Sequence, residues 1–301
     1  MVKTVLGDIR IQDLSITLAH EHICCYSEYA YAMVGKQYLD KELLERVAIE
    51  YLRELKRKHR LSSLVDCTAV NIGRDLDLLR RISERSEVNI ITSTGFYYGD
   101  EPLLYGASSD RLCSLIVSDA KAHHAGIIKC AVDKETLTLF QRKLIEACAK
   151  AQLYTGLPIV LHTNAQNRNA LPALEILVSE GVSPRAVTVG HLSDTEDISY
   201  VEGIAAEGFY IGLDRLYGNP NEGYIEKKLA CICALVESGY SDQILLSHDA
   251  LFFNGFEAEP KIYERPRLSY CFDYILPRLP KALADKLMID NPAHMLNTHR
   301  A

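Results

Sequence analysis

Short apolar runs rich in β-branched residues recur along the chain, and longer stretches with apolar residues at helical spacing separate them. The clearest helical patterns cover residues 41–59 and 135–152, where charged residues lie between the apolar positions. Alternation of strand and helix along the chain predicts an α/β fold, a closed (β/α)8 TIM barrel. Eight runs predict its strands, at residues 16–20, 63–68, 89–94, 126–131, 158–163, 186–191, 208–213 and 243–248.

The chain is expected to form a single domain over residues 1–301, because no stretch rich in Pro, Gly or Ser divides it. An open, doubly wound sheet is the alternative for the same alternation. Such sheets commonly bind nucleotides through a glycine-rich loop, and neither G-x-G-x-x-G nor G-x-x-x-x-G-K-[ST] follows any predicted strand. The closed barrel is therefore favoured.

Composition and charge narrow the range of functions. The chain is 48% hydrophobic and 24% charged with a formal net charge of -7, and its Lys and Arg residues are scattered. This balance is typical of a folded globular protein and argues against nucleic acid as a partner. No apolar run reaches the roughly 18 residues of a membrane span, and no signal peptide precedes the first strand. We therefore expect no membrane partner and a cytoplasmic location.

The nine cysteines are spread from Cys24 to Cys271 without any C-x-x-C pair. We expect most of them to be reduced and buried. Two close pairs, Cys24 with Cys25 and Cys231 with Cys233, remain candidates for metal binding or reactivity, although their spacing matches no familiar site.

Polar residues stand where several predicted strands end, and the active site of such a barrel lies at the carboxyl ends of its strands. The first strand ends in His20-Glu21-His22. Because side chains alternate along a strand, both imidazoles point to the same side. Taken alone, this triplet is more typical of histidines with local hydrogen bonds than of a metal site.

Three further predicted strands end in the same kinds of side chain, at His162, His191 and His248-Asp249. Neutral imidazoles and carboxylates are standard ligands of zinc-like divalent ions, so these strand ends together indicate a metal centre. Lys129 lies inside an apolar strand, where an unpaired ammonium is strongly disfavoured. Close to two metal ions, a buried lysine can instead react with carbon dioxide and bridge the ions as a carbamate.

These motifs resemble the phosphotriesterase family of the amidohydrolase superfamily, which includes phosphotriesterase-like lactonases. The resemblance spans essentially the whole chain and keeps the order of the motifs. It rests on T-L-A-H-E-H at 17–22, S-T-G-F-Y-Y at 93–98, A-G-I-I-K at 125–129, L-H-T-N at 161–164, V-G-H-L-S-D at 189–194, I-G-L-D-R at 211–215, L-S-H-D at 246–249 and N-P-A at 291–293.

The resemblance implies a binuclear metal centre. Its ligands are His20, His22 and Asp249 on one metal, His162 and His191 on the other, and N-carboxylated Lys129 with a hydroxide between the two. Zinc is the expected metal, and manganese, cobalt or iron suit the same ligands. Two such ions lower the pKa of a bridging water towards about 7, so the nucleophile is hydroxide, and Asp249 accepts its proton.

Four other polar residues are expected to have no catalytic role. Glu21 faces away from the two histidines beside it, and His248 faces away from Asp249, so each should form a structural ion pair or hydrogen bond. His123 and His124 lie just before the fourth strand, away from the catalytic rim, and are expected at the surface.

Two residues near the rim indicate the class of substrate. Family members that open lactones carry a tyrosine after the third strand and an arginine after the seventh, and Tyr97 and Arg215 match these positions. The resemblance implies that Tyr97 hydrogen-bonds the ring oxygen of the leaving group and that Arg215 orients this tyrosine or the loop. Ordinary packing at the rim is the alternative.

The stretch from Leu251 to Tyr270 departs from the longer apolar loop that holds fatty acyl chains in some lactonases. Arg267 and Tyr270 are three positions apart, so a helix that begins there would place both on one face towards the site. Their donors suit a phosphate, in agreement with the resemblance to members that hydrolyse phosphorylated furanose lactones. Solvated surface charge is the alternative.

The sequence therefore predicts a metal-dependent hydrolase that opens a small polar lactone, with a phosphorylated sugar lactone favoured. A phosphotriesterase or broad carboxylesterase is the alternative, and a metal-binding barrel without catalysis is the third candidate. Because family members are commonly dimers, the resemblance also implies a homodimer.

Overall fold

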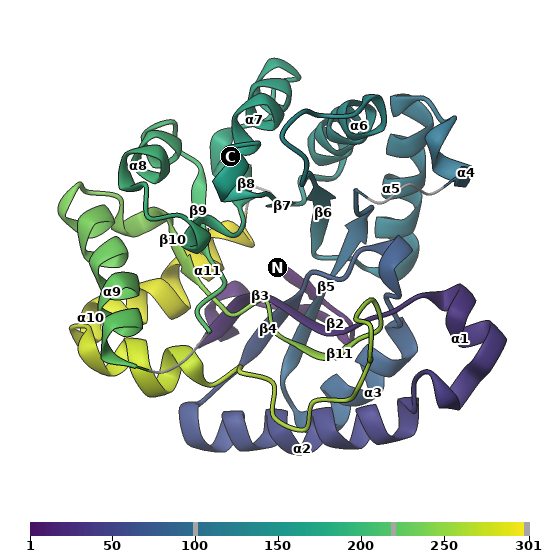
Figure 1. The fold of residues 1–301 in the computed structure, drawn as a ribbon, viewed down its shortest axis with the longest axis horizontal. Helices are drawn as coiled ribbons and strands as arrows, with labels where there is room; N and C mark the ends of the chain where they lie inside the picture. Colours follow the sequence, from purple (N-terminus) through teal and green to yellow (C-terminus); the bar gives the residue numbers. More distant parts are fainter. Residues whose placement is uncertain (99–101, 218–220, 298–301) are drawn as a thin grey trace.

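A ring of parallel strands surrounded by helices forms the centre of the molecule (Figure 1). The computed structural model describes residues 1–98, 102–217 and 221–297. Its main sheet has the strand order β10-β9-β8-β7-β6-β5-β4-β3-β11, with all pairs parallel. The strands are β3 (Thr17–Cys25), β4 (Ser63–Asp66), β5 (Asn89–Gly95), β6 (Ile127–Ala131), β7 (Ile159–His162), β8 (Val187–Val189), β9 (Tyr210–Leu213), β10 (Ile244–Leu246) and β11 (Leu251–Asn254).

The eighth barrel strand is interrupted, which explains why nine strands fill eight barrel positions. β10 pairs with β9, whereas β11 pairs with β3 at the other edge of the sheet. Between them, Asp249 has a left-handed backbone with φ of 52°. Its N–H donates to the His20 carbonyl at 3.0 Å. The segment from β10 to β11 thus closes the sheet, and the predicted (β/α)8 TIM barrel is confirmed.

Each predicted strand overlaps an observed one, and six of the eight observed strands are shorter than predicted. The first is longer, because β11 supplies backbone partners beyond residue 20. Leu251 pairs with His22, and Phe253 pairs with Cys24. This extension carries the first strand past its own histidines into the rim of the barrel.

Helices cover the outside of the barrel (Figure 1). α2 has the predicted bounds of 41–59, whereas α6 begins at Leu139 because Thr138 caps it in a capping box with Gln141. No helix in the described ranges is long and apolar enough to cross a membrane. The helices are α1 (Glu28–Val34), α2 (Lys41–His59), α3 (Leu76–Ser86), α4 (Pro102–Tyr105), α5 (Ser109–His123), α6 (Leu139–Thr155), α7 (Ala170–Ser179), α8 (Ile198–Ala206), α9 (Glu222–Glu237), α10 (Lys281–Asp285) and α11 (Asn291–Met295).

Apolar side chains fill the barrel beneath the rim. Val65, Ile91, Ile127 and Val160 belong to one buried cluster and come from four successive strands. Two short strands, β1 (Val2–Thr4) and β2 (Gly7–Ile9), form a separate antiparallel hairpin. Val2 from β1 joins the same cluster. The packed interior gives the polar rim above it a rigid base.

Candidate metal centre and substrate cleft

Side chains from the first and last barrel strands converge at the carboxyl rim. Asp249 Oδ1 lies 3.6 Å from His20 Nε2 and 3.2 Å from His22 Nε2. The three residues offer ligand atoms that all lie within 4.8 Å of one another. Two imidazole nitrogens and a carboxylate oxygen at this spacing are a suitable partial set for a divalent ion.

The other three predicted ligands lie beside this group. His191 Nε2 is 2.6 Å from His162 Nδ1. Lys129 is fully buried, and its Nζ is 2.8 Å from His20 Nε2. Among the described residues, no carboxylate pairs with the Lys129 ammonium. This is expected if the position carries a modified lysine. The donor set therefore fits a pair of divalent cations.

Two of these ligands have strained backbones. His191 and Asp249 both adopt the left-handed conformation, with φ of 65° and 52°. Residues with a Cβ adopt this conformation only when surrounding contacts hold them there, and such strain clusters at functional sites. The turn at each strand end directs the ligand side chain into the rim instead of continuing the strand.

Burial sets the protonation of two histidines in the centre. Burial and the charge of Lys129 lower the pKa of His20 to about 3. Burial and the charge of His191 lower the pKa of His162 well below its ordinary value. Both imidazoles are therefore neutral at pH 7, which is the form that binds metal.

Charged neighbours act differently on His22 and Asp249. Burial alone would lower the pKa of His22, but Cys25 and Asp249 raise it to about 10. Burial alone would raise the pKa of Asp249, but His191 and His22 lower it well below its ordinary value. Asp249 is therefore ionised at pH 7, the form that a metal ligand or a proton acceptor requires.

Asp214 is a buried member of the site that the sequence analysis did not single out. One carboxylate oxygen lies 2.5 Å from His20 Nδ1, and the other lies 2.9 Å from His191 Nδ1. A carboxylate accepts hydrogen bonds only, so both histidines carry their proton on Nδ1 and leave Nε2 free for metal. Asp214 thus orients one predicted ligand of each of the two expected metals.

We predict that Asp214→Asn weakens metal binding about 10- to 100-fold while the barrel remains folded. An amide has one acceptor and one donor, so it can support the ligating tautomer of only one of the two histidines. Metal titration of the apoprotein measures this effect, and circular dichroism checks the fold. Unchanged affinity for both metals would remove Asp214 from the site.

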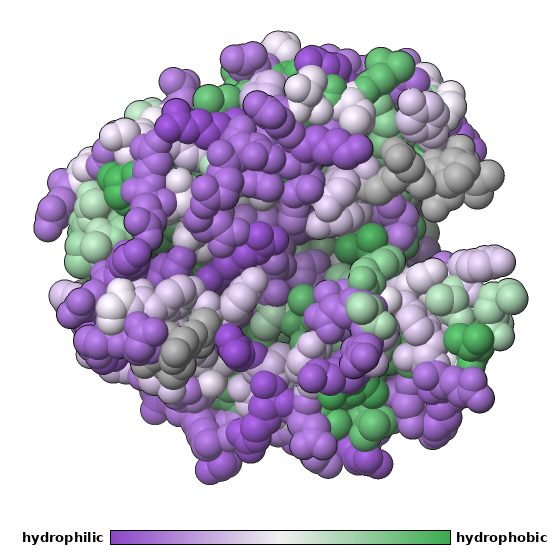
Figure 2. Space-filling model, viewed as in Figure 1, coloured by the Kyte–Doolittle hydropathy of each residue, from purple (hydrophilic) through white to green (hydrophobic). Residues whose placement is uncertain are grey.

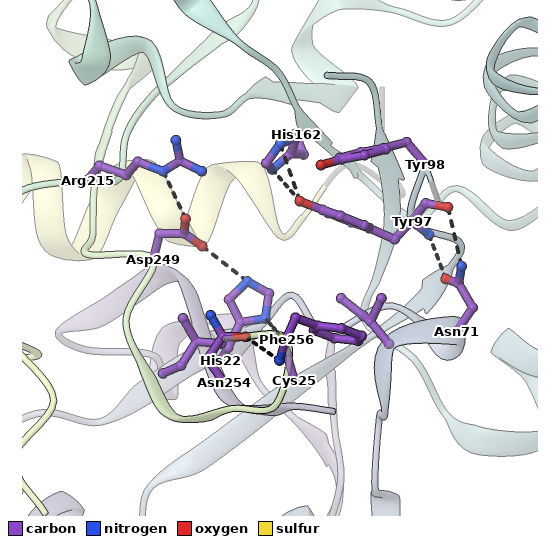
Figure 3. Close-up of a pocket in the computed structure, with 12 residues that line it drawn as sticks. His22, Cys25, Asn71, Tyr97, Tyr98, His162, Arg215, Asp249, Asn254 and Phe256 are labelled. Carbon is purple, nitrogen blue, oxygen red and sulfur yellow. Dashed lines mark hydrogen bonds and ion pairs between the residues drawn. The ribbon is translucent and has the colours of Figure 1, made fainter. Parts of the chain in front are cut away.

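A cavity of about 510 Å³ opens beside the metal ligands. Figure 2 shows a mostly hydrophilic face with hydrophobic residues beside a central hollow, and Figure 3 shows the residues around the cavity. A second cavity of about 500 Å³ shares Asp249, Leu251 and Asn254 with the first and includes Arg265 and Arg267. The lining of the first cavity is His22, Cys25, Asn71, Ile72, Tyr97, Tyr98, His162, Arg215, Asp249, Leu251, Asn254 and Phe256.

Tyr97 and Arg215 stand on opposite sides of this cavity (Figure 3). The Tyr97 hydroxyl is 3.4 Å from both ring nitrogens of His162. Arg215 donates to Asp249 Oδ2 at 2.9 Å and to Asp194 Oδ2 at 2.6 Å. Among the described residues its ion-pair partners are these two carboxylates, so Arg215 contacts the predicted ligand Asp249 and the loop that carries Asp194 rather than Tyr97.

Arg267 and Tyr270 were expected to share one helix face towards the site, but they do not. Arg267 is exposed and lines the second cavity. Tyr270 is only 4% exposed and packs beside Tyr224 and Tyr274. The Tyr270 N–H donates to the Arg267 carbonyl at 3.3 Å, so the two residues span a tight turn instead of a helix face. Only Arg267 reaches the cleft.

The buried Glu21 and His248 form a structural pair, as predicted. Glu21 Oε1 lies 2.7 Å from His248 Nδ1 and accepts the hydroxyl of Ser247 at 2.8 Å. His248 Nε2 accepts the Cys271 N–H at 3.0 Å. This network ties the first strand to the last, beneath the metal ligands.

The remaining histidine and cysteine predictions concern residues outside the centre. His123 is exposed, and His124 is partly exposed and paired with Asp8. All nine cysteines are free, and most are buried, as predicted. Among the described residues, no cysteine belongs to a group with metal-ligand spacing. The two close cysteine pairs thus gain no support as metal sites.

Comparison with known proteins agrees with this architecture. The model of the phosphotriesterase family matches residues 1–296. The chain belongs to the phosphotriesterase family. It is 32% identical to an aryldialkylphosphatase from Saccharolobus solfataricus over 286 residues, covering 91% of this chain and 90% of the relative. It is 30% identical to a phosphotriesterase homology protein from Mycobacterium tuberculosis over 314 residues, covering 97% and 96%.

A more distant relative has a different name. The chain is 26% identical to the human N-acetyltaurine hydrolase over 352 residues, covering 98% of this chain and 97% of the relative. Phosphotriesterase-family proteins are binuclear metal-dependent hydrolases. This phosphotriesterase-family chain is therefore a metal-dependent hydrolase, and the relatives differ in the substrates that their names describe.

Proposed function

We propose that the protein opens a small polar lactone, in preference to a phosphotriester. The observation that carries this proposal is the hydroxyl of Tyr97, which faces the cavity beside His162 at 3.4 Å. Opening an aliphatic lactone releases a poor alkoxide leaving group, which needs a proton or hydrogen-bond donor. An aryl phosphotriester releases a more stable phenoxide and needs no such donor.

The metal centre in this proposal contains two divalent ions, with zinc expected and with Lys129 N-carboxylated between them. When bound, the ions supply a water that ionises near neutral pH, and they polarise the carbonyl under attack. His20, His22 and Asp249 hold one ion, and His162 and His191 hold the other. The mixed imidazole and carboxylate set also suits manganese, cobalt or iron.

Three side chains move or hold protons around this centre. Asp249 is ionised and accepts the proton released by the attacking water. Arg215 holds Asp249 through Oδ2 at 2.9 Å, which leaves Oδ1 towards the histidines. Burial and the neighbouring Tyr98 raise the pKa of Tyr97, so its phenol stays protonated and donates to the departing ring oxygen.

The direct test is a panel of lactones compared with an aryl dialkyl phosphotriester, with metal-loaded protein. We expect kcat/KM to be highest for a small polar lactone. A preference for the phosphotriester would favour the second candidate function, which the similarity to an aryldialkylphosphatase supports. Activity on simple aryl esters alone would favour a broad carboxylesterase, and inactivity on every compound would favour a non-catalytic barrel.

A phosphate on the substrate is the finer part of the proposal. Arg267 lines the second cavity, which shares Asp249 and Leu251 with the cavity beside the predicted metal ligands. A guanidinium suits a phosphate because it offers paired donors. Tyr270, the other residue predicted to bind this phosphate, would have to leave its buried position to do so.

We predict that Arg267→Ala lowers kcat/KM for a phosphorylated sugar lactone about ten- to a hundredfold, the equivalent of 1.5 to roughly 3 kcal/mol for a lost charge-assisted hydrogen bond. Hydrolysis of the unphosphorylated lactone should hardly change. Arg265→Ala is the matched control, because Arg265 is paired with Glu54 on α2. Equal losses on both lactones in Arg267→Ala would mean that Arg267 supports the loop instead.

A further inference from the structure

The side-chain amide of Asn71 holds the backbone of Tyr97 with two hydrogen bonds (Figure 3). The Tyr97 N–H donates to Asn71 Oδ1 at 2.7 Å, and Asn71 Nδ2 donates to the Tyr97 carbonyl at 3.3 Å. The last residues that β4 and β5 pair directly are Asp66 and Thr92. Asn71 therefore imitates a further backbone pair at the point where the sheet has ended.

Tyr97 needs such support because β5 ends at Gly95. Gly95 has φ of 94°, and a Cβ there would lie 2.1 Å from the Lys129 carbonyl oxygen, so the chain bends away from the sheet at this point. Tyr97 lies beyond the bend, and the ladder of β5 no longer fixes its backbone. The bonds from Asn71 hold the residue whose hydroxyl faces His162.

The segment that carries Asn71 is itself fixed to its neighbours. The Ser93 hydroxyl donates to the Thr68 carbonyl at 2.7 Å. The Tyr26 N–H donates to the Ile72 carbonyl at 2.9 Å. These bonds join the segment to the strands on both sides. The amide of Asn71 is therefore presented from a rigid support.

We infer that Asn71 is a positioning residue that sets where the Tyr97 hydroxyl meets the leaving group. This inference rests on the proposed function, because it assigns the donor role to Tyr97. A displacement of about 1 Å in a reacting group can cost a hundredfold in rate. Asn71 also lines the cavity, so its action through Tyr97 has to be separated from direct contact with substrate.

A double-mutant cycle makes this separation. Asn71→Ala is expected to lower kcat for an aliphatic lactone about ten- to a hundredfold with KM changed less than about threefold. In a Tyr97→Phe background the same change should have less than about a twofold effect, because the hydroxyl it positions is gone. Asn71→Asp should resemble Asn71→Ala, since its second oxygen repels the Tyr97 carbonyl.

Asn254→Ala is the matched control. Asn254 lines the same cavity, but its side chain contacts Glu257 and the Phe256 N–H instead of Tyr97. The effect of Asn254→Ala on kcat should therefore be the same in the wild-type and Tyr97→Phe backgrounds. An aryl ester with a good leaving group is the control substrate, and Asn71→Ala should change its hydrolysis less than about threefold.

A crystal structure of Asn71→Ala supplies a readout that does not depend on activity. We expect the Tyr97 hydroxyl to move out of reach of His162 while metal content and thermal midpoint stay at wild-type values. An unmoved Tyr97, or a loss in Asn71→Ala that persists in full in the Tyr97→Phe background, would overturn the inference. A Tyr97→Phe variant with unchanged lactone turnover would instead overturn the proposed role of Tyr97, and the displacement in the crystal would still decide whether Asn71 positions it.

Discussion

Asp249→Asn is expected to lower turnover about 10²- to 10⁴-fold, the usual range for loss of a general base. The substitution keeps the shape of the side chain but removes the charge that binds metal and the oxygen that accepts the proton. Asp249 lies 3.2 Å from His22 Nε2 and 2.9 Å from Arg215 Nε, so an amide must also give up one of two charged contacts. Steady-state kinetics of the metal-loaded variant measure the loss.

Asp194→Asn is the control for this substitution. Asp194 is the other carboxylate that Arg215 contacts, at 2.6 Å, and it is not a predicted metal ligand. We expect Asp194→Asn to lower turnover only about tenfold, since Arg215 keeps its bond to Asp249. Asp249→Asn with wild-type turnover and full metal content would remove Asp249 from the mechanism.

Lys129→Ala is expected to abolish the second metal site and nearly all activity while the barrel survives. The substitution removes the group proposed to bridge the ions and leaves a space where a fully buried side chain stood. A cavity of this kind costs roughly 2 to 5 kcal/mol of stability. Metal analysis and thermal unfolding measure the two effects separately.

Lys129→Glu is the companion variant. A glutamate carboxylate lies closer to the backbone than the carbamate does, so it should restore part of the metal binding and part of the activity. Lys129→Ala with both metals and full turnover would show that the carbamate bridge is wrong.

The sequence was sufficient to predict the barrel and the convergence of the predicted metal ligands at one rim. The predicted His and Asp ligands stand where short apolar runs end, and the rule that strand ends share one rim brings together residues as distant as His20 and Asp249. The helix at 41–59 was predictable because apolar residues at helical spacing fill one side of it, and the structure shows that Asp40 caps its start.

Asp214 was missed because a single aspartate after a strand is also typical of a turn or a helix cap. The signal was present, since it ends an apolar run just as the ligands do. Its function depends on contacts with two histidines: His20, which is 194 positions away in the sequence, and His191, which is 23 positions away. Only the closed ring of strands places one carboxylate between them.

The split eighth strand and the positions of Arg267 and Tyr270 were also beyond sequence patterns. Asp249 has its left-handed backbone between β10, which pairs with β9, and β11, which pairs with β3. Tyr270 is drawn into an aromatic cluster with Tyr224 and Tyr274, and this burial outweighs the periodicity that predicted a shared helix face. Tertiary contacts decide both cases.

The central claim is a binuclear centre built from six side chains of this chain. The most direct test is the metal content of purified wild-type protein after incubation with excess zinc and bicarbonate and removal of free metal. The account predicts two ions per chain, because five His and Asp ligands with a bridging lysine exceed one four-coordinate site. A content that stays near one ion per chain under these conditions would contradict it.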